Sequence, residues 1–193
     1  MSEIMMKQFL RGLGCAAVLG LSLSTLASLS SQTQTAKKLQ APILVTSAGQ
    51  ALDAFTVKTL LGRASVNANY DAKATATALD NAKTVIIAVG ASNKGFGQAG
   101  ITAETETART KAILDTAKAK GIPVVCVHIG GAERRKGLSV QFVEQVCPAA
   151  DYIVVSKDGN ADNYFDGIAK DKGISLTIID QSLDVGKALA ALI

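Results

Sequence analysis

Hydrophobic residues occur in short continuous runs that alternate with longer stretches of mixed polarity. Three runs are almost wholly apolar, at residues 43–45, 85–89 and 122–129, and each is followed by glycine or small polar residues. Such a run is typical of a strand buried on both faces of a parallel sheet, because a half-exposed strand would alternate in polarity. Weaker strands are predicted at 66–70, 152–155 and 176–179, which makes six in all.

Helical spacing of apolar residues predicts helices between these strands, at 51–63, 74–82, 102–120, 139–146, 164–172 and 183–192. In the longest of them, Thr102 is a suitable N-cap, Glu104 and Glu106 suit the positive end of the helix dipole, and Gly121 is a suitable terminator. Strict alternation of strand and helix predicts an α/β fold. We expect a doubly wound, flavodoxin- or Rossmann-like parallel sheet of about six strands, with helices on both faces.

The polarity of the strands predicts their order. The 66–70 strand carries Asn67 and Asn69, which favours an edge, whereas the 85–89 strand is apolar throughout and should be internal. The order 2-1-3-4-5-6 satisfies both conditions better than 3-2-1-4-5-6. Ligands of such sheets bind outside the carboxyl ends of the strands where the order reverses, here between the first and third strands.

Residues 1–36 are interpreted as an export signal and a polar linker. Lys7 and Arg11 precede an apolar segment at 13–29, and residues 28–36 are small and polar. A single α/β domain is predicted over 41–193, in a protein exported to the periplasm or the cell exterior. An uncleaved membrane anchor is the alternative, because an apolar segment of about 17 residues is near the lower limit for spanning a bilayer.

Composition narrows the range of partners. The net charge is +4 and aromatic residues make up 4% of the chain, with the basic residues scattered, so we expect no nucleic-acid binding. Cys126 lies within a predicted strand and Cys147 precedes Pro148 at a predicted helix end. The sequence favours two buried thiols over a disulfide, which would need Cα atoms within about 7 Å.

The predicted strand ends carry glycine, hydroxyl, amide and cationic residues, which together favour a site for a small polar or anionic ligand. Glycine amides would hold the ligand and the cations would set its charge. The candidate residues are Ser47, Gly49, Gln50, Gly90, Ser92, Asn93, Lys94, Gly95, His128, Gly130, Gly131, Arg134, Arg135 and Asn160.

Two segments match a cofactor-binding or metal-binding motif only in part, so no cofactor and no metal is expected. Residues 95–100 fit G-x-G-x-x-G, but they follow the third strand at a distance, and a flexible glycine-rich loop over 90–100 is the better interpretation. Residues 158–169 resemble the start of a calcium loop but lack its glycine at position six and its final glutamate.

Two other functions stay open. A hydrolase or transferase could use His128 as its base, Ser47 or Ser92 as nucleophile and Asp180 as orienter, although 90–95 does not match G-x-S-x-G. The structural alternative for His128 is a hydrogen bond to neighbouring backbone. A partner-binding module without a small-molecule site is the third possibility.

The segments at 46–50, 90–100 and 159–160, together with 128–131 and the following Arg134 and Arg135, resemble an uncharacterised "domain of unknown function" family of exported bacterial α/β domains. The resemblance covers nearly all of the chain after the leader. It implies export and this fold, and it implies no activity.

Overall fold

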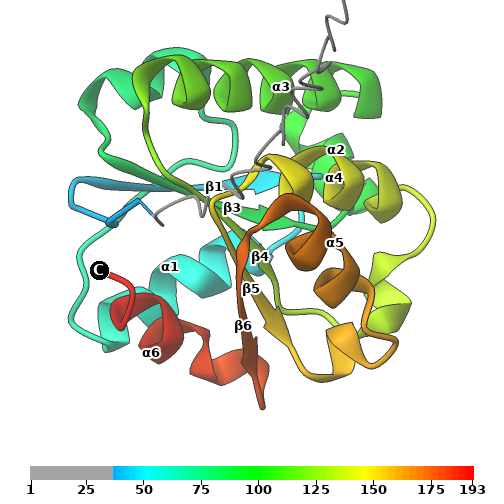
Figure 1. The fold of residues 1–193 in the computed structure, drawn as a ribbon. Helices are drawn as coiled ribbons and strands as arrows, with labels where there is room; N and C mark the ends of the chain where they lie inside the picture. The colour runs from blue at the N-terminus through cyan, green and yellow to red at the C-terminus, as the bar shows by residue number, and fades with distance from the viewer. Residues whose placement is uncertain (1–36) are drawn as a thin grey trace, which may run out of the picture. The chain divides into compact units, whose positions relative to one another are not determined.

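The computed structural model describes residues 37–193. They contain one sheet of six parallel strands in the order β2-β1-β3-β4-β5-β6, which confirms the predicted fold class and strand order (Figure 1). The strands are β1 (Ile43–Ala48), β2 (Asn69–Tyr70), β3 (Thr84–Val89), β4 (Val124–His128), β5 (Tyr152–Ser156) and β6 (Ser175–Ile179). The predicted export signal and linker at 1–36 lie outside the described residues.

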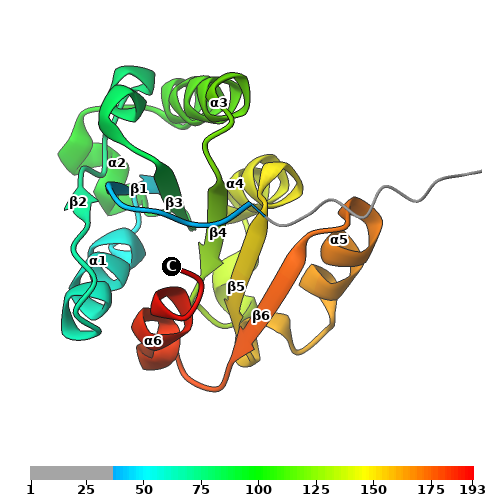
Figure 2. The same cartoon turned by 60° about the vertical axis from the view of Figure 1, so that its left-hand side comes forward.

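Helices cover both faces of the sheet. The α-helices are α1 (Asp53–Arg63), α2 (Asn93–Ala99), α3 (Ala103–Lys120), α4 (Ser139–Val146), α5 (Tyr164–Lys172) and α6 (Val185–Ala190). Short 3₁₀ segments are η1 (Ala76–Asn81), η2 (Ala132–Arg135), η3 (Cys147–Ala149), η4 (Asp158–Asn160) and η5 (Ser182–Asp184). Helices α1 and α6 lie together on one side, and α3, α4 and α5 lie on the other (Figure 2).

The core consists of two apolar layers, one on each side of the sheet. Successive residues of a strand point into opposite layers, so Ile87 packs with α3 and α4 whereas Ile86 packs with α1 and α6. Both layers are mainly aliphatic, and each needs apolar side chains from the strands, which explains why the central strands are apolar at consecutive positions. Within residues 37–193, no helix combines the length and the apolar character needed to cross a membrane.

The folded part begins earlier than predicted. Leu39 is fully buried in the α1–α6 layer. The Lys37 carbonyl accepts a hydrogen bond from the Tyr152 hydroxyl at 2.8 Å, and the Gln40 amide donates to Thr84 Oγ1 at 2.9 Å. The segment just before residue 41 therefore packs against the sheet, because its single leucine and its backbone groups have specific partners there.

Cys126 and Cys147 form a disulfide, so the preference for two thiols was wrong. Both residues are fully buried and their Cα atoms are 5.4 Å apart. The reason is the length of α4, which has only eight residues. It returns over the sheet just far enough for η3 to hold Cys147 beside the middle of β4.

The segment between β2 and β3 also differs from expectation. An α-helix was predicted at 74–82, but the chain forms the 3₁₀ helix η1 (Ala76–Asn81). Leu79 is the single buried residue of η1. An α-helix would need a regular apolar face to pack on the sheet. A segment with one buried apolar residue instead favours the short, tight 3₁₀ helix.

Candidate functional site

The carboxyl ends of β1 and β3 are in direct backbone contact. Gly49 has φ +103°, and a Cβ atom added there would overlap the Gly90 carbonyl. A Cβ added at Gly95 would overlap the carbonyl of Gln50, and Gln50 also forms an isolated antiparallel bridge with Ala91. The topological switch point is thus filled by the chain's own backbone where the sequence predicts a crevice.

A buried carboxylate completes this closure. The Glu106 side chain is 0% exposed and reaches the switch point from the first turn of α3. Its Oε1 accepts hydrogen bonds from the Gly49 amide at 2.9 Å and from Gln50 Nε2 at 3.0 Å. Two donors assigned to a ligand therefore hold an internal carboxylate. Sequence reasoning missed this role because Glu106 was interpreted only as a partner of the helix dipole.

Arg109 neutralises Glu106 and ties it to two further segments. Its Nε donates to Glu106 Oε2 at 2.8 Å, and its Nη1 donates to the Ala74 carbonyl at 2.7 Å. Its Nη2 donates to the Ser47 carbonyl at the end of β1. The pair is an i, i+3 arrangement on α3, a spacing that the sequence displays but that is also common on solvated helices.

The glycine-rich segment after β3 forms a helix, so the prediction of a flexible loop over 90–100 was wrong. Ser92 is the N-cap of α2, with its hydroxyl accepting from the Gly95 amide at 3.1 Å, and Gly100 ends the helix in the left-handed conformation. Phe96 anchors α2 in the core, which the glycine content obscured. Asn93 and Lys94 are exposed on its first turn.

His128 is a core residue at the end of β4. Its ring is fully buried and stacks on Phe165 with centroids 5.5 Å apart, and Nδ1 lies 3.3 Å from the Val89 carbonyl. Nε2 has no hydrogen-bond partner among the described residues. Burial lowers the pKa of His128, so the ring is neutral at neutral pH.

Neither of the two candidate serines is paired with this histidine. Ser47 is buried and its hydroxyl lies 3.5 Å from the Ala51 carbonyl, while the Ser92 hydroxyl caps α2. In the described part of the chain, no hydrogen bond joins His128 to either hydroxyl. The nucleophile–base pair that the hydrolase alternative requires is not assembled.

The cations after β4 point to different internal partners. Arg134 Nη2 lies 3.6 Å from Asp53 Oδ2. Arg135 pairs with Asp162, whose pKa this bond lowers, and its guanidinium lies 4.2 Å from the centre of the Tyr164 ring. The two arginines diverge and do not form one anion clamp.

The remaining predicted residues form a second packed group between β4 and β5. The Gly130 carbonyl accepts from the Ser156 hydroxyl at 3.1 Å, and Gly131 lies against Asp158. Asn160 Oδ1 accepts from the Phe165 amide at 2.9 Å, and its Nδ2 donates to Asp166 at 2.6 Å. Asn160 thus satisfies one amide in the first turn of α5, whose N-cap residue is Asn163. Residues 37–193 contain no cluster of three or more metal-ligating side chains.

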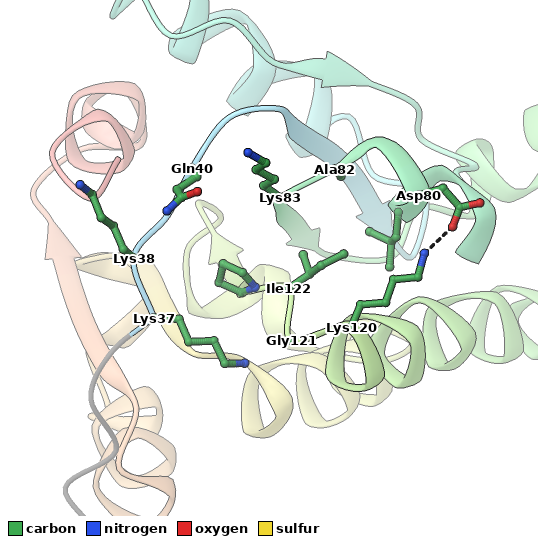
Figure 3. A pocket seen from close by; sticks show the side chains of 11 residues that line it. Lys37, Lys38, Gln40, Asp80, Ala82, Lys83, Lys120, Gly121 and Ile122 are labelled. Carbon is green, nitrogen blue, oxygen red and sulfur yellow. Dashed lines mark hydrogen bonds and ion pairs between the residues drawn. The ribbon is translucent and has the colours of Figure 1, made fainter.

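A charged cavity lies at the opposite end of the sheet. This lysine pocket is an open depression of about 420 Å³, lined by Lys37, Lys38, Gln40, Leu79, Asp80, Ala82, Lys83, Lys120, Gly121, Ile122 and Pro123 (Figure 3). Three segments supply it: the approach to β1, the η1–β3 connection, and the α3–β4 connection. Sequence reasoning missed the pocket because these lysines are far apart along the chain and precede the strands.

The lysines of the pocket differ in their partners. Lys120 pairs with Asp80, and Lys37 pairs with Asp151 at 3.0 Å. Lys38 and Lys83 are exposed and form no ion pair with another described residue. In the view of Figure 3, Gln40 lies between these two lysines.

A family model described as "Domain of unknown function (DUF6305)" matches residues 40–193. The chain belongs to this family. The DUF6305 match confirms the resemblance to an uncharacterised family, and it spans all six strands and the lysine pocket except for Lys37 and Lys38. No curated protein matches this chain.

A solved structure of a mutant form of a protein described as "Esterase AlinE4" is similar to this DUF6305 domain at 13% sequence identity. The similarity covers 78% of this chain and 80% of that chain, with a TM-score of 0.31. A similarity at that level carries no argument about activity.

Proposed function

We propose that this protein is an exported domain that binds a small, multiply charged anion in the lysine pocket. The observation that supports it is the pair of exposed lysines, Lys38 and Lys83, that border a cavity and have no carboxylate partner among residues 37–193. The pocket is lined by four lysines, of which Lys37 and Lys120 pair with aspartates, so two uncompensated positive charges remain.

The chemistry of the lining favours a compact anion. Lysine ammonium groups are point charges on flexible stems, so they suit oxyanions and polycarboxylates of several shapes. Ile122 and Pro123 provide an apolar floor, and the Gln40 side chain adds an amide. Among residues 37–193, no aromatic side chain on which a base could stack lines this pocket.

The carboxyl ends of the strands remain the predicted alternative location. There Gly49, Gln50 and Arg135 already have internal partners, and Arg134 lies near Asp53. A ligand at that end would have to displace these bonds, whereas a ligand in the lysine pocket would add to unsatisfied charges. The balance of charges therefore favours the amino ends.

A titration with two matched variants tests the location. Pyrophosphate and citrate are titrated calorimetrically into the full chain at low ionic strength, where exposed charges are least screened. The double variant Lys38→Gln/Lys83→Gln should weaken binding at least about tenfold, equivalent to about 1.4 kcal/mol. Arg134→Gln removes one exposed cation from the other end and should leave the affinity unchanged.

Other outcomes would decide against the proposal. Loss of binding in Arg134→Gln alone would move the site to the carboxyl ends. Absence of heat with both anions would remove the small-anion function. Binding that does not weaken as salt is added would mean that the lysine charges do not carry it.

The disulfide supports the export part of the proposal. Disulfides persist in oxidising compartments outside the cytosol, and the Cys126–Cys147 bond lies in the core. Alkylation of the denatured, unreduced protein from cell fractions tests it. We expect Cys126 and Cys147 to be unmodified and the protein to occur in the exported fraction; cytosolic protein with two alkylated thiols would contradict export.

A further inference from the structure

The two edges of the sheet are protected differently. The β2 edge has only two residues, so it offers little backbone to a partner. The β6 edge has five residues, Ser-Leu-Thr-Ile-Ile, without charge, proline or bulge, and it pairs with β5 without a gap. Ile178 is 49% exposed there. A regular, uncharged edge of this kind is a template for strand addition.

The unpaired backbone groups of β6 can be assigned. The Ile179 carbonyl accepts from the Lys157 amide at 2.8 Å, so Ile179 faces β5. Because successive residues of a strand face opposite sides, Leu176 and Ile178 direct their amides and carbonyls outward. Outside the sheet ladder, no hydrogen bond within residues 37–193 reaches the backbone of either residue.

We infer that this edge pairs antiparallel with β6 of a second copy of the chain, so that the two sheets continue across a two-fold axis. An axis at Thr177 sets Leu176 of each copy opposite Ile178 of the other and satisfies all the outward groups of both strands. Leu176 and Ile178 lie on the same face, so the register also brings apolar side chains together.

Charge complementarity supports a second copy as the occupant. In this register Asp180 of one copy lies opposite Ile174 of the other, two residues from Lys172. Asp180 and Lys172 are exposed and opposite in charge, and Lys170 offsets the exposed Asp171, so the last turn of α5 is net positive. The interface is isologous, so each such pair occurs twice.

Two substitutions at one position test the backbone contact. Ile178→Pro removes an outward amide that β5 does not use, whereas Ile178→Ala keeps the amide and shortens the side chain. Light scattering and sedimentation on the full chain should give a dimer for the original protein and for Ile178→Ala. Ile178→Pro should weaken dimerisation at least about tenfold. If Ile178→Pro does not fold, Ile178→Lys provides the second variant and should also give a monomer.

Cross-linking tests the register. With Thr177→Cys, the two introduced thiols meet at the axis, so oxidation should give a covalent dimer. Ser175→Cys on the same strand places the thiols about 13 Å apart and should stay monomeric on a reducing-agent-free gel. A wild-type protein that is monomeric at every concentration would overturn the inference, including the case in which another segment of the same chain covers the edge. A dimer that survives both Ile178→Pro and Ile178→Lys would overturn it as well.

Discussion

The two ends of the sheet use their charges in opposite ways. At the carboxyl ends, Glu106 and Arg109 are buried together and bond to the backbone of β1, so the polar groups of that end satisfy one another. At the amino ends, Lys38 and Lys83 border a cavity without acidic partners among the described residues. Sheet topology alone predicts a ligand site at the carboxyl ends of the strands. The lysines without internal partners favour a ligand site at the amino ends.

The largest expected effect tests whether the carboxyl end is a structural centre. Glu106→Ala leaves the Arg109 cation, which is 13% exposed, without its carboxylate and the Gly49 amide without an acceptor. We expect a loss of about 3–5 kcal/mol in the free energy of unfolding, measured by chemical denaturation.

The matched control is the exposed ion pair on the same helix. Lys111 and Asp115 lie 2.6 Å apart with side chains 68% and 63% exposed. Asp115→Ala should cost less than about 0.5 kcal/mol. Equal losses in the two variants would show that Glu106 does not hold the switch point closed.

The disulfide stabilises the fold nearer the amino ends of the strands, as the Glu106–Arg109 pair does at the carboxyl ends. Cys147 lies in η3, which follows the end of α4 nearest the amino ends. The disulfide closes a loop with a sequence separation of 21 residues. Loop-closure entropy then predicts a loss of about 3 kcal/mol in the double variant Cys126→Ala/Cys147→Ala. Reductant should lower the denaturation midpoint of the original protein and leave the variant unchanged. A reductant effect on the variant would contradict this assignment.

A smaller effect should appear in the pH dependence of stability. Burial lowers the pKa of His128 in the folded state, so the unfolded chain binds a proton that the folded chain does not. The contribution of His128 to the free energy of unfolding is complete above the unfolded pKa of about 6.5. It is lost as the pH falls towards the folded pKa, by at most about 1.4 kcal/mol per pH unit.

Because His128 is the chain's single histidine, its removal gives a clean control. His128→Gln should flatten the free energy of unfolding between about pH 5.5 and 7.5. A slope that persists in this variant would assign the dependence to another group.

The smallest effect on stability is expected at the lysine pocket. Asp80 is 63% exposed and pairs with Lys120, so Asp80→Asn should change the free energy of unfolding by less than about 0.5 kcal/mol. The same variant removes the one negative side chain of the pocket lining and should strengthen pyrophosphate binding. Unchanged affinity together with unchanged stability would mean that this charge does not face the ligand.

The fold could be predicted because it depends on local patterns. Runs such as Val85–Ile87 are apolar at every position since they are covered on both faces, and the polar Asn67–Asn69 stretch marks an edge. The ends of α3 were also predicted correctly, because Thr102 is its N-cap and Gly121 ends it in the left-handed conformation.

The arrangement at the strand ends could not be predicted because it depends on partners distant in sequence. Glu106 meets Gly49 across 57 positions, and before folding it resembles any acidic residue in a first helical turn. The helix α2 was hidden by its glycines, although Ser92 and Gly100 are suitable caps. Lys38 and Lys83 come together only because the approach to β1 crosses the start of β3.

That approach also has a mechanical consequence. The Lys37 carbonyl bonds to Tyr152 in β5 and the Gln40 amide to Thr84 in β3, with β4 between those strands. Residues 37–40 therefore cross the sheet and link β5 to β3. A pull from the amino-terminal side would load these contacts with β5 and β3 before it could peel β1 away.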